Sequence, residues 1–481
     1  MFSKIKSLII KNYFFILILL AGAFLRFYRL EEFAQFLSDQ GRDAIIVKRI
    51  ITLEHLPAIG PPTSIGQVYL GPFYYYFIAP WLLIFNFNPA GLAFAVALFS
   101  CIFIFLSYWL IKKIFNQKLA LFFSLFNVFS FILIDFSRFS WNPNLLPYFT
   151  FLSVYFFLTA RNTNKILYYL LSGTFLSFSI QLHYLALTLI PPITFLLLKD
   201  LITNFRKQIN KVLLFFLSFS FFNLPLLIFD LRHNFLNLKS FIKLFQTQSN
   251  AKIDYFDNLK LTFAKLNEYL FNTKINDIWL IALLVLIISV LFICFKKKNQ
   301  IWYFLYFFLS ILFSLSFYSG PKHAHYFGVI FPFYLLILSY FLSFISDFNW
   351  GKILVIVFFL AFTFLNYQNY YFLFKPPSNQ ILHAKKVADF LAQKIEGKPF
   401  NIATWPVEFF EDSYLYFLEL KNLRPANRQK IEITNQMFVL CAKEPCQIIN
   451  SPSWNISMFG KAKIDKIWEY EGLKIYKLIH Q

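Results

Sequence analysis

Residues 91–111 read GLAFAVALFSCIFIFLSYWLI and are followed at once by Lys112 and Lys113. An α-helix needs about 20 apolar residues to cross the ~30 Å hydrocarbon core of a membrane, so this stretch predicts one transmembrane helix. The paired lysines fit its cytoplasmic end, because short cytoplasmic loops carry an excess of Lys and Arg. Runs of the same kind recur along the first three quarters of the chain, and they decide the fold class.

The composition of the whole chain agrees with a membrane protein. Of 481 residues, 58% are hydrophobic and 14% are charged, and the mean hydropathy is +0.57. This excludes soluble dehydrogenases and kinases, coiled coils, collagen-like chains and disordered chains. The formal charge of +21 comes in large part from short clusters between apolar runs, such as Lys296–Lys298, which membrane topology explains. No nucleic-acid partner is expected, because no basic stripe with interleaved aromatics lies outside the apolar runs.

Eleven apolar runs are predicted to span the membrane. They cover approximately residues 13–25, 91–111, 119–134, 145–160, 166–180, 185–198, 212–229, 278–295, 301–317, 327–345 and 353–371. The loops that this assignment places in the cytoplasm are short and basic, as the positive-inside rule requires. We therefore expect a multi-pass plasma-membrane protein with a cytoplasmic N-terminus and, because the number of spans is odd, an extracytoplasmic C-terminus.

The predicted outer side carries two long loops, at about 29–88 and 230–277, and a tail. Residues 1–375 are expected to form a transmembrane helical bundle, and residues 376–481 a small extracytoplasmic α/β domain. Within the first loop, the apolar stretch 71–87 contains Pro80 and is short, which favours an interfacial or re-entrant helix. A full span is the alternative, but it would invert every later loop and spoil the charge asymmetry. The tail shows a helical pattern and short strands. These elements are a helix at 384–394, strands at 400–404 and 437–441, and a hairpin around Glu471 and Gly472.

Cys441 and Cys446 lie in the polar tail as C-x4-C. This spacing permits a disulfide in an oxidising compartment, although free thiols remain an alternative. No second Cys or His pair completes a zinc site, so no metal centre and no cofactor are expected.

The strongest local signal for chemistry is the sequence from Ser38 to Asp43, SDQGRD, directly after the first span. Asp39 and Asp43 are four residues apart, so both carboxylates share one face of a helix. The residues that follow predict an amphipathic surface helix, which would hold the acids at the membrane boundary. The alternative is an interfacial helix whose acidic first turn is simply solvated.

Further polar and aromatic residues punctuate the same predicted outer side. A Gly/Pro-rich stretch at 59–72 contains Tyr69, whose ring could support a sugar or a lipid, although an aromatic interface belt is the alternative. Cations are unexpected on this side, yet three occur at span ends, where snorkelling is the alternative role. The candidates are Arg138, Asn142 and Asn144 in one turn, His183 in a second, Arg232 at the end of a span, and Lys322, His325 and Tyr326 before another.

Together these features resemble the GT-C glycosyltransferases, in particular the branch of the protein O-mannosyltransferases and the lipid A aminoarabinose transferases. The resemblance rests on the acidic position after the first span, occupied by Asp39, and on Lys322 and Tyr326 followed by Pro332. The chain departs from the family where Gln40 replaces a second acid and where Asn142 and Asn144 stand in place of an acidic motif.

The resemblance implies inverting transfer of a hexosyl or pentosyl group from a polyprenyl-phosphate donor to a hydroxyl of a glycan, lipid or protein on the outer face of the membrane. Asp39 would act as base and Asp43 as its helper. Arg232, Lys322, Tyr326 and Arg138 would bind the donor phosphate, and Tyr69, Asn142, Asn144, His183 and His325 the substrate. A transporter or flippase, and a ligase or polymerase that uses diphosphate-linked lipids, remain alternatives.

Overall fold

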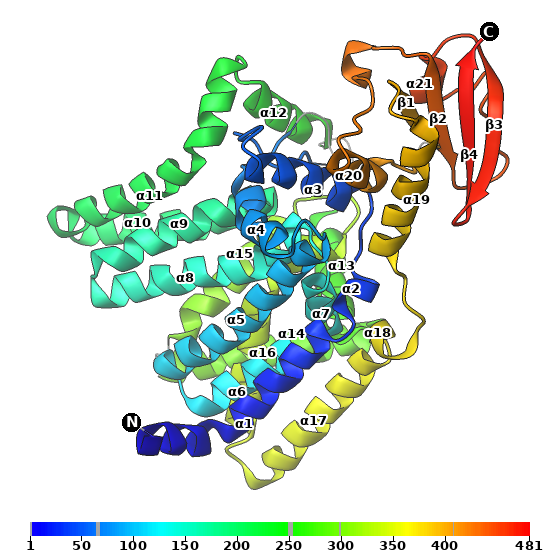
Figure 1. The fold of residues 1–481 in the computed structure, drawn as a ribbon. Coiled ribbons are helices and arrows are strands. Elements are labelled where there is room, and N and C mark those ends of the chain that lie inside the picture. Colours follow the sequence, from blue (N-terminus) through cyan, green and yellow to red (C-terminus); the bar gives the residue numbers. More distant parts are fainter. Residues whose placement is uncertain (1, 64–67, 249–253, 298–299, 407) are drawn as a thin grey trace. The chain divides into compact units, whose positions relative to one another are not determined.

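The computed structural model describes residues 2–63, 68–248, 254–297, 300–406 and 408–481 (Figure 1). Residues 64–67 of the Gly/Pro-rich stretch, residues 249–253 of the second outer loop and Lys298 of the basic cluster lie outside the described residues. The chain divides into two compact units. The helical unit contains Met1–Tyr28, Pro57–Phe77 and Ala95–Lys375, and the mixed unit contains Arg29–Leu56, Ile78–Phe94 and Pro376–Gln481.

The helical unit is built from apolar helices, and each of the eleven predicted spans falls on one of them or on a short helix joined to one. All or most of each of the following helices lies in this unit: α1 (Phe2–Phe27), α5 (Ala90–Ile114), α6 (Gln117–Phe129), α7 (Phe131–Ser137), α8 (Leu146–Thr163), α9 (Ile166–Leu182), α10 (Ile190–Thr203), α11 (Phe205–Arg232), α12 (Leu236–Gln248), α13 (Tyr255–Phe271), α14 (Asp277–Lys297), α15 (Ile301–Leu315), α16 (Phe331–Ile345), α17 (Asn349–Tyr367) and α18 (Tyr371–Phe374). The predicted helical bundle is therefore confirmed.

Helix length sets a stricter test for membrane crossing. Among the described residues, four helices are long and apolar enough to cross, or five if the bent pair α6 and α7 forms one span. Six apolar helices are shorter, with 10–17 residues. One of these is α4 (Phe73–Ile84), in the stretch predicted as interfacial or re-entrant; its 12 residues span only ~18 Å. The number of eleven crossings stays a prediction.

The bend between α6 and α7 is 64° and occurs at Ser130, whose backbone is extended. The side-chain oxygen of Asn366 on α17 accepts a hydrogen bond from the N–H of Phe131, at 2.7 Å. A break in a helix frees backbone groups that need new partners in apolar surroundings. Asn366 supplies one at the first residue after the break.

Among the described residues of the helical unit there are three 3-10 helices, and each is followed at once or after one residue by an α-helix. They are η1 (Asn142–Leu145), η2 (Tyr184–Leu189) and η3 (Ala324–Val329). The helices that follow, α8, α10 and α16, all have Pro in the first turn, where the missing N–H has no intrahelical partner to lose. The segments η1 and η2 both pack against η3, so this arrangement gathers the polar residues of three turns.

The mixed unit contains a four-stranded sheet with the order β1-β2-β4-β3. Its strands are β1 (Asn401–Trp405), β2 (Gln436–Cys441), β3 (Ala462–Tyr470) and β4 (Leu473–His480). Strands β1 and β2 are parallel, and the other two pairs are antiparallel. Glu471 and Gly472 both have positive φ, which suits the tight turn of the β3–β4 hairpin. Helices α19 (Gln380–Ile395) and α20 (Asp412–Leu420) complete the predicted small α/β domain (Figure 1).

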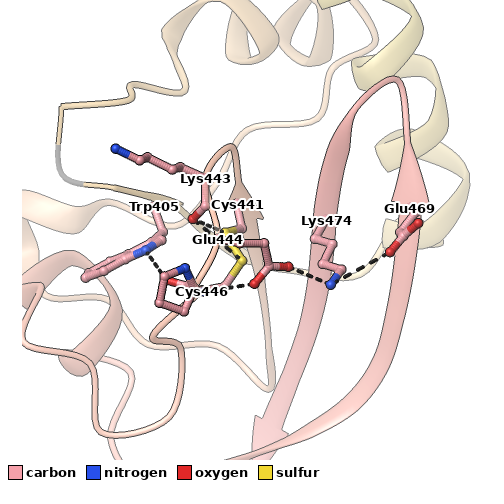
Figure 2. The surroundings of a disulfide bond; sticks show 8 residues. Trp405, Cys441, Lys443, Glu444, Cys446, Glu469 and Lys474 are labelled. Carbon is pink, nitrogen blue, oxygen red and sulfur yellow. Dashed lines mark hydrogen bonds and ion pairs between the residues drawn. A yellow bond between two sulfur atoms is a disulfide. The ribbon is translucent and has the colours of Figure 1, made fainter.

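A disulfide joins Cys441 and Cys446, the pair whose bridging the sequence left open (Figure 2). The loop that it closes contacts two further strands. Trp405 Nε1 at the end of β1 donates to the carbonyl of Pro445 at 3.1 Å, and Glu444 forms an ion pair with Lys474 of β4. Among the described residues, Cys101 is the one free cysteine.

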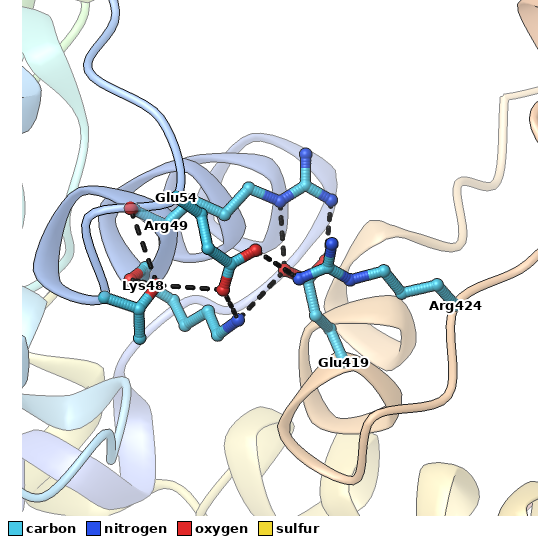
Figure 3. Close-up of polar contacts among 6 residues, drawn as sticks. Lys48, Arg49, Glu54, Glu419 and Arg424 are labelled. Atoms are coloured by element: carbon cyan, nitrogen blue, oxygen red, sulfur yellow. Dashed lines mark hydrogen bonds and ion pairs between the residues drawn. The ribbon is translucent and has the colours of Figure 1, made fainter.

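Helix α3 (Ser38–Ile51) packs against α20 within the mixed unit, through glycine and through charge. A Cβ on Gly41 would lie 2.3 Å from the backbone nitrogen of Ser413, so only glycine permits this approach. At the other end of the contact, buried Glu419 accepts hydrogen bonds from Arg49 Nε at 2.9 Å and from Arg49 Nη2 at 2.7 Å (Figure 3).

The same carboxylate serves two further cations. Arg424 Nη2 lies 3.1 Å and Lys48 Nζ 3.5 Å from Glu419 Oε1, and Glu54 contacts both of these cations from the other side (Figure 3). We call these five residues, Lys48, Arg49, Glu54, Glu419 and Arg424, the ion cluster. Because Glu419 is buried and Arg49 is partly exposed, the cluster depends on the one carboxylate at its centre.

Replacing Glu419 by glutamine is expected to loosen the mixed unit. The change leaves the cations without a buried counter-charge, which should lower the free energy of unfolding by about 2 to 4 kcal/mol. Glu54→Gln is the matched control and should cost less, because Glu54 is nearer the surface. Thermal unfolding of the purified protein measures both variants. Equal losses would mean that the buried carboxylate is not the centre of the cluster.

Candidate active site

The predicted acidic pair lies in the first turns of α3, and the two carboxylates differ in accessibility. The Asp39 side chain is 43% exposed and that of Asp43 is 1% exposed. Arg42 joins them: Nη1 donates to Asp39 Oδ1 at 2.8 Å, while Nε and Nη2 donate to Asp43 Oδ1 at 2.9 and 2.7 Å. Asp39 is therefore accessible from outside the protein, whereas Asp43 is buried against the same arginine that binds Asp39.

Gln40 occupies the place where the resembled family has a second acid. Its side chain is buried, and Oε1 accepts a hydrogen bond from the backbone N–H of Leu37 at 3.1 Å. The residue thus satisfies a donor at the start of α3, as a capping side chain does. The difference from the family at this position has a structural explanation in this chain.

Asp412, in the first turn of α20, is a further acid near this group that the sequence did not reveal. Burial, and then the neighbouring Glu411, raise the pKa of Asp412 to about 6, while the charges of Arg42 and Arg428 act in the opposite direction. The position of Asp412 near Arg42 could not be predicted from local sequence, because α20 is distant along the chain. Gly41, whose missing side chain lets α20 approach, gives no sign of which segment packs against it.

In the helical unit, the 3-10 turns bring together several of the predicted site residues. The ring of His325 lies 4.4 Å from that of Tyr326, 5.6 Å from that of His183 and 4.7 Å from that of Trp141, measured between centroids. Lys322 Nζ lies 5.2 Å from the ring centre of Tyr318, which in turn lies 5.6 Å from the ring of Tyr326. We call Trp141, His183, Lys322, His325 and Tyr326 the aromatic cluster.

All five members of this cluster are half-buried, and burial shifts the pKa values of those that titrate. Burial lowers the pKa of Lys322 to about 8, although Nζ donates to the carbonyls of Leu315, at 3.2 Å, and of Tyr318. Burial also lowers the pKa of His183 to about 4 and that of His325 to about 3. At neutral pH the cluster therefore contains one cation and two neutral imidazoles, which can donate to or accept from a hydroxyl. Among the described residues, no group of three His, Cys, Asp or Glu side chains could hold a metal ion.

Tyr69 is held by its backbone. Its N–H donates to Asn237 Oδ1 at 2.6 Å, and its carbonyl accepts from Tyr184 and from Asn237 Nδ2. Asp230 accepts the N–H of Asn237 at 2.7 Å, which caps the start of α12. These contacts fix the loop before α4 against η2 and α12. Arg232, in the last turn of α11, is exposed.

Arg138, Asn142 and Asn144 are buried and bind backbone carbonyls. Arg138 donates to the carbonyls of Leu25, Arg26 and Tyr28 at 2.8 to 3.1 Å, and its guanidinium stacks 3.9 Å from the ring centre of Phe372. Asn142 donates to the carbonyl of Leu182, the last residue of α9, and Asn144 to that of Phe139. These bonds satisfy carbonyls that helix ends and turns leave without partners. Donor-phosphate binding by Arg138 and substrate binding by Asn142 and Asn144 stay predictions.

Comparison with known proteins places this geometry in a wider context. The family model described as dolichyl-phosphate-mannose-protein mannosyltransferase matches residues 70–228, about a third of the chain. This part contains Arg138, Asn142, Asn144 and His183, but neither Asp39 nor Lys322. No curated protein matches the sequence.

Solved structures show a closer likeness in fold. ArnT from Cupriavidus metallidurans bound to undecaprenyl phosphate is similar with a TM-score of 0.63 at 12% identity, over 97% of this chain and 98% of that chain. The archaeal oligosaccharyltransferase AglB from Archaeoglobus fulgidus, in complex with an inhibitory peptide and a dolichol-phosphate, gives a TM-score of 0.51 at 12% identity, over 90% of this chain and 70% of that chain. The chain therefore has the GT-C fold, as its resemblance to the GT-C glycosyltransferases predicted.

Proposed function

We propose that this protein is a membrane glycosyltransferase that moves a sugar from a polyprenyl-phosphate donor to a hydroxyl acceptor on the outer face of the plasma membrane. The observation that carries the proposal is the accessible carboxylate of Asp39, held by an arginine whose other partner is buried. The solved structures of similar fold support the donor class, because one was bound to undecaprenyl phosphate and another to a dolichol-phosphate.

The chemistry requires a base and a cation. Asp39 takes the proton of the acceptor hydroxyl, and the oxygen of that hydroxyl forms a bond to the anomeric carbon of the sugar. The bond between that carbon and the phosphate oxygen breaks, and its electron pair leaves with the polyprenyl phosphate. A direct displacement of this kind inverts the anomeric configuration.

The growing negative charge of the leaving phosphate needs a donor in a site of low dielectric. Lys322 has that environment, and Tyr318, whose ring lies 5.2 Å from Lys322 Nζ, packs against the ring of Tyr326, which would add a hydroxyl. Arg232 can approach a lipid headgroup because it is exposed, and a guanidinium binds phosphate through two parallel hydrogen bonds. The neutral rings of His183 and His325 suit hydroxyl groups of the sugar. Tyr69 would border the same substrate.

The direct experiment incubates the purified protein with radiolabelled polyprenyl-phosphate sugars and membrane glycans, and then separates the labelled products. Release of free polyprenyl phosphate together with a labelled acceptor supports the proposal. If label appears on the other side of sealed vesicles with the sugar still attached to its lipid, the protein is a flippase. If only diphosphate-linked donors react, it is a ligase or polymerase.

Asp39→Asn should abolish most transfer while donor binding stays nearly unchanged, because loss of a general base costs roughly 10² to 10⁴ in rate. Glu32→Gln is a matched control. Glu32 is 44% exposed and pairs with Arg29 three residues away, as Asp39 pairs with Arg42. Turnover and donor affinity are measured for both variants. Near-normal turnover of Asp39→Asn would remove Asp39 from the reaction.

Donor affinity is expected to fall as the pH rises through about 8. The pKa of Lys322 is lowered by burial, so its charge is present below pH 8 and is lost above it. A tenfold weaker binding at pH 9 follows if only the charged form binds the phosphate, since each pH unit above the pKa lowers the charged fraction about tenfold. Lys322→Arg should bind with little dependence on pH, and Lys322→Gln weakly throughout. Titration of donor analogues from pH 6.5 to 9.5 tests this; identical profiles for wild type and Lys322→Arg would contradict it.

The proposed orientation places the sheet of the mixed unit outside the cytoplasm. Alkaline phosphatase fused after Gln481 should then be active, and green fluorescent protein fused there should be dark. Non-reducing mass spectrometry should find Cys441 and Cys446 bridged in the native protein. A fluorescent fusion together with free thiols would contradict the proposed orientation and place the C-terminus in the cytoplasm.

A further inference from the structure

A cavity of about 760 Å³ lies within the mixed unit. Its walls come from α3, from the start of β1, from α20 and the loop after it, and from α21 (Trp454–Ser457). This volume is within the range of about 300 to 1,000 Å³ that is usual for small-ligand sites. None of the residues assigned above to the donor phosphate lines the cavity.

The charges in the cavity wall balance. The described lining residues include three arginines and three carboxylates, which are Arg49, Arg424, Arg428, Glu411, Asp412 and Glu419. Each arginine is bound to an acid: Arg49 and Arg424 to Glu419, and Arg428 to Glu411. An anion would have to compete with these carboxylates, and a cation with these guanidinium groups. The balanced wall therefore favours an uncharged ligand.

The wall nevertheless has many hydrogen-bonding groups. A guanidinium has five N–H donors. The bonds of Arg49 to Glu419 use two of them, and those of Arg428 come from one nitrogen. Carboxylate oxygens alternate with these donors, so the wall offers both kinds of partner over a short distance. A hydroxyl group, which donates and accepts at once, matches such a wall better than a group with a single role.

One edge of the cavity is aromatic. The side chain of Trp454 lines it and is 53% exposed, and Asn455 beside it adds an amide. An exposed tryptophan next to amide and guanidinium groups provides an apolar face for the C–H side of a sugar ring and polar partners for its hydroxyls.

We propose that this cavity binds the neutral saccharide part of the acceptor, so that the acceptor is a glycan. The proposal rests on the proposed function, because it names the class of acceptor for the same reaction. Helix α3 connects the two places: Ile45 and Arg49 line the cavity, and Ile45 follows Asp39 by six residues, or ~9 Å along the helix axis. Asp412, another part of the wall, interacts electrostatically with Arg42, which binds Asp39. A glycan bound in the cavity would therefore contact α3, the helix that carries the proposed base.

The test measures saccharide binding by the full-length protein in detergent micelles, with no donor present. The probe is an array of neutral oligosaccharides with two to four sugar residues, followed by titration of the best ligand. We expect at least one to bind, and inorganic phosphate not to displace it. Trp454→Ala should weaken binding at least tenfold, and Asn455→Ala should weaken it as well.

Phe410→Ala is the matched control, because Phe410 is a 52% exposed aromatic residue of the same unit that does not line the cavity. It should leave binding unchanged, and thermal unfolding shows that the variants remain folded. The proposal is overturned if no neutral oligosaccharide binds, if phosphate displaces the ligand, or if Trp454→Ala binds like wild type. Sugar transfer by a protein that binds no saccharide refutes this inference alone. Saccharide binding without any transfer refutes the proposed function and, with it, the assignment of the bound saccharide as acceptor, and leaves only the saccharide site.

Discussion

Every backbone carbonyl and N–H that lies in apolar surroundings needs a hydrogen-bond partner, and this requirement organises the helical unit. A continuous helix meets it without help, but breaks and turns do not. At these places the chain uses buried polar side chains: Arg138 for the carbonyls at the end of α1, Asn142 for the last carbonyl of α9, and Asn366 for the first N–H of α7. Because these bonds hold the turns in place, the 3-10 segments can present the aromatic cluster in a defined arrangement.

The same requirement explains what the sequence could and could not predict. Apolar runs, the period of α3 and the Glu471-Gly472 turn are local patterns, and the structure contains the corresponding elements. The function of a cation at a helix end is not local. Arg138 and Lys322 look alike in sequence, yet Arg138 is fully buried and donates to three backbone carbonyls, while Lys322 is half-buried, donates to two, and has a lowered pKa.

Long-range partners were beyond the sequence for a related reason. Arg49 and Glu419 are separated by 370 residues, and neither local sequence indicates that the two side chains form a pair. Gly41 was visible as a glycine within a helical pattern, but the close approach that requires it belongs to α20. The acid that we expected to assist Asp39 is buried under Arg42, and the additional acid Asp412 comes from the distant helix. Accessibility, which separates Asp39 from Asp43, follows only from packing.

The mixed unit is assembled from segments that are far apart in the chain, and this has a consequence for biosynthesis. Helix α3 is made early, but the surface that covers it, α20, is made more than 300 residues later, after all the helices of the other unit. The sheet beside α20 also waits, because β4 lies between β2 and β3 and is the last of the four strands to leave the ribosome. The charged face of α3 therefore stays unassembled through most of translation. A chain that stops before α20 lacks both the surface that packs on Gly41 and the carboxylate that binds Arg49, so one face of α3 has no cover until synthesis is nearly complete.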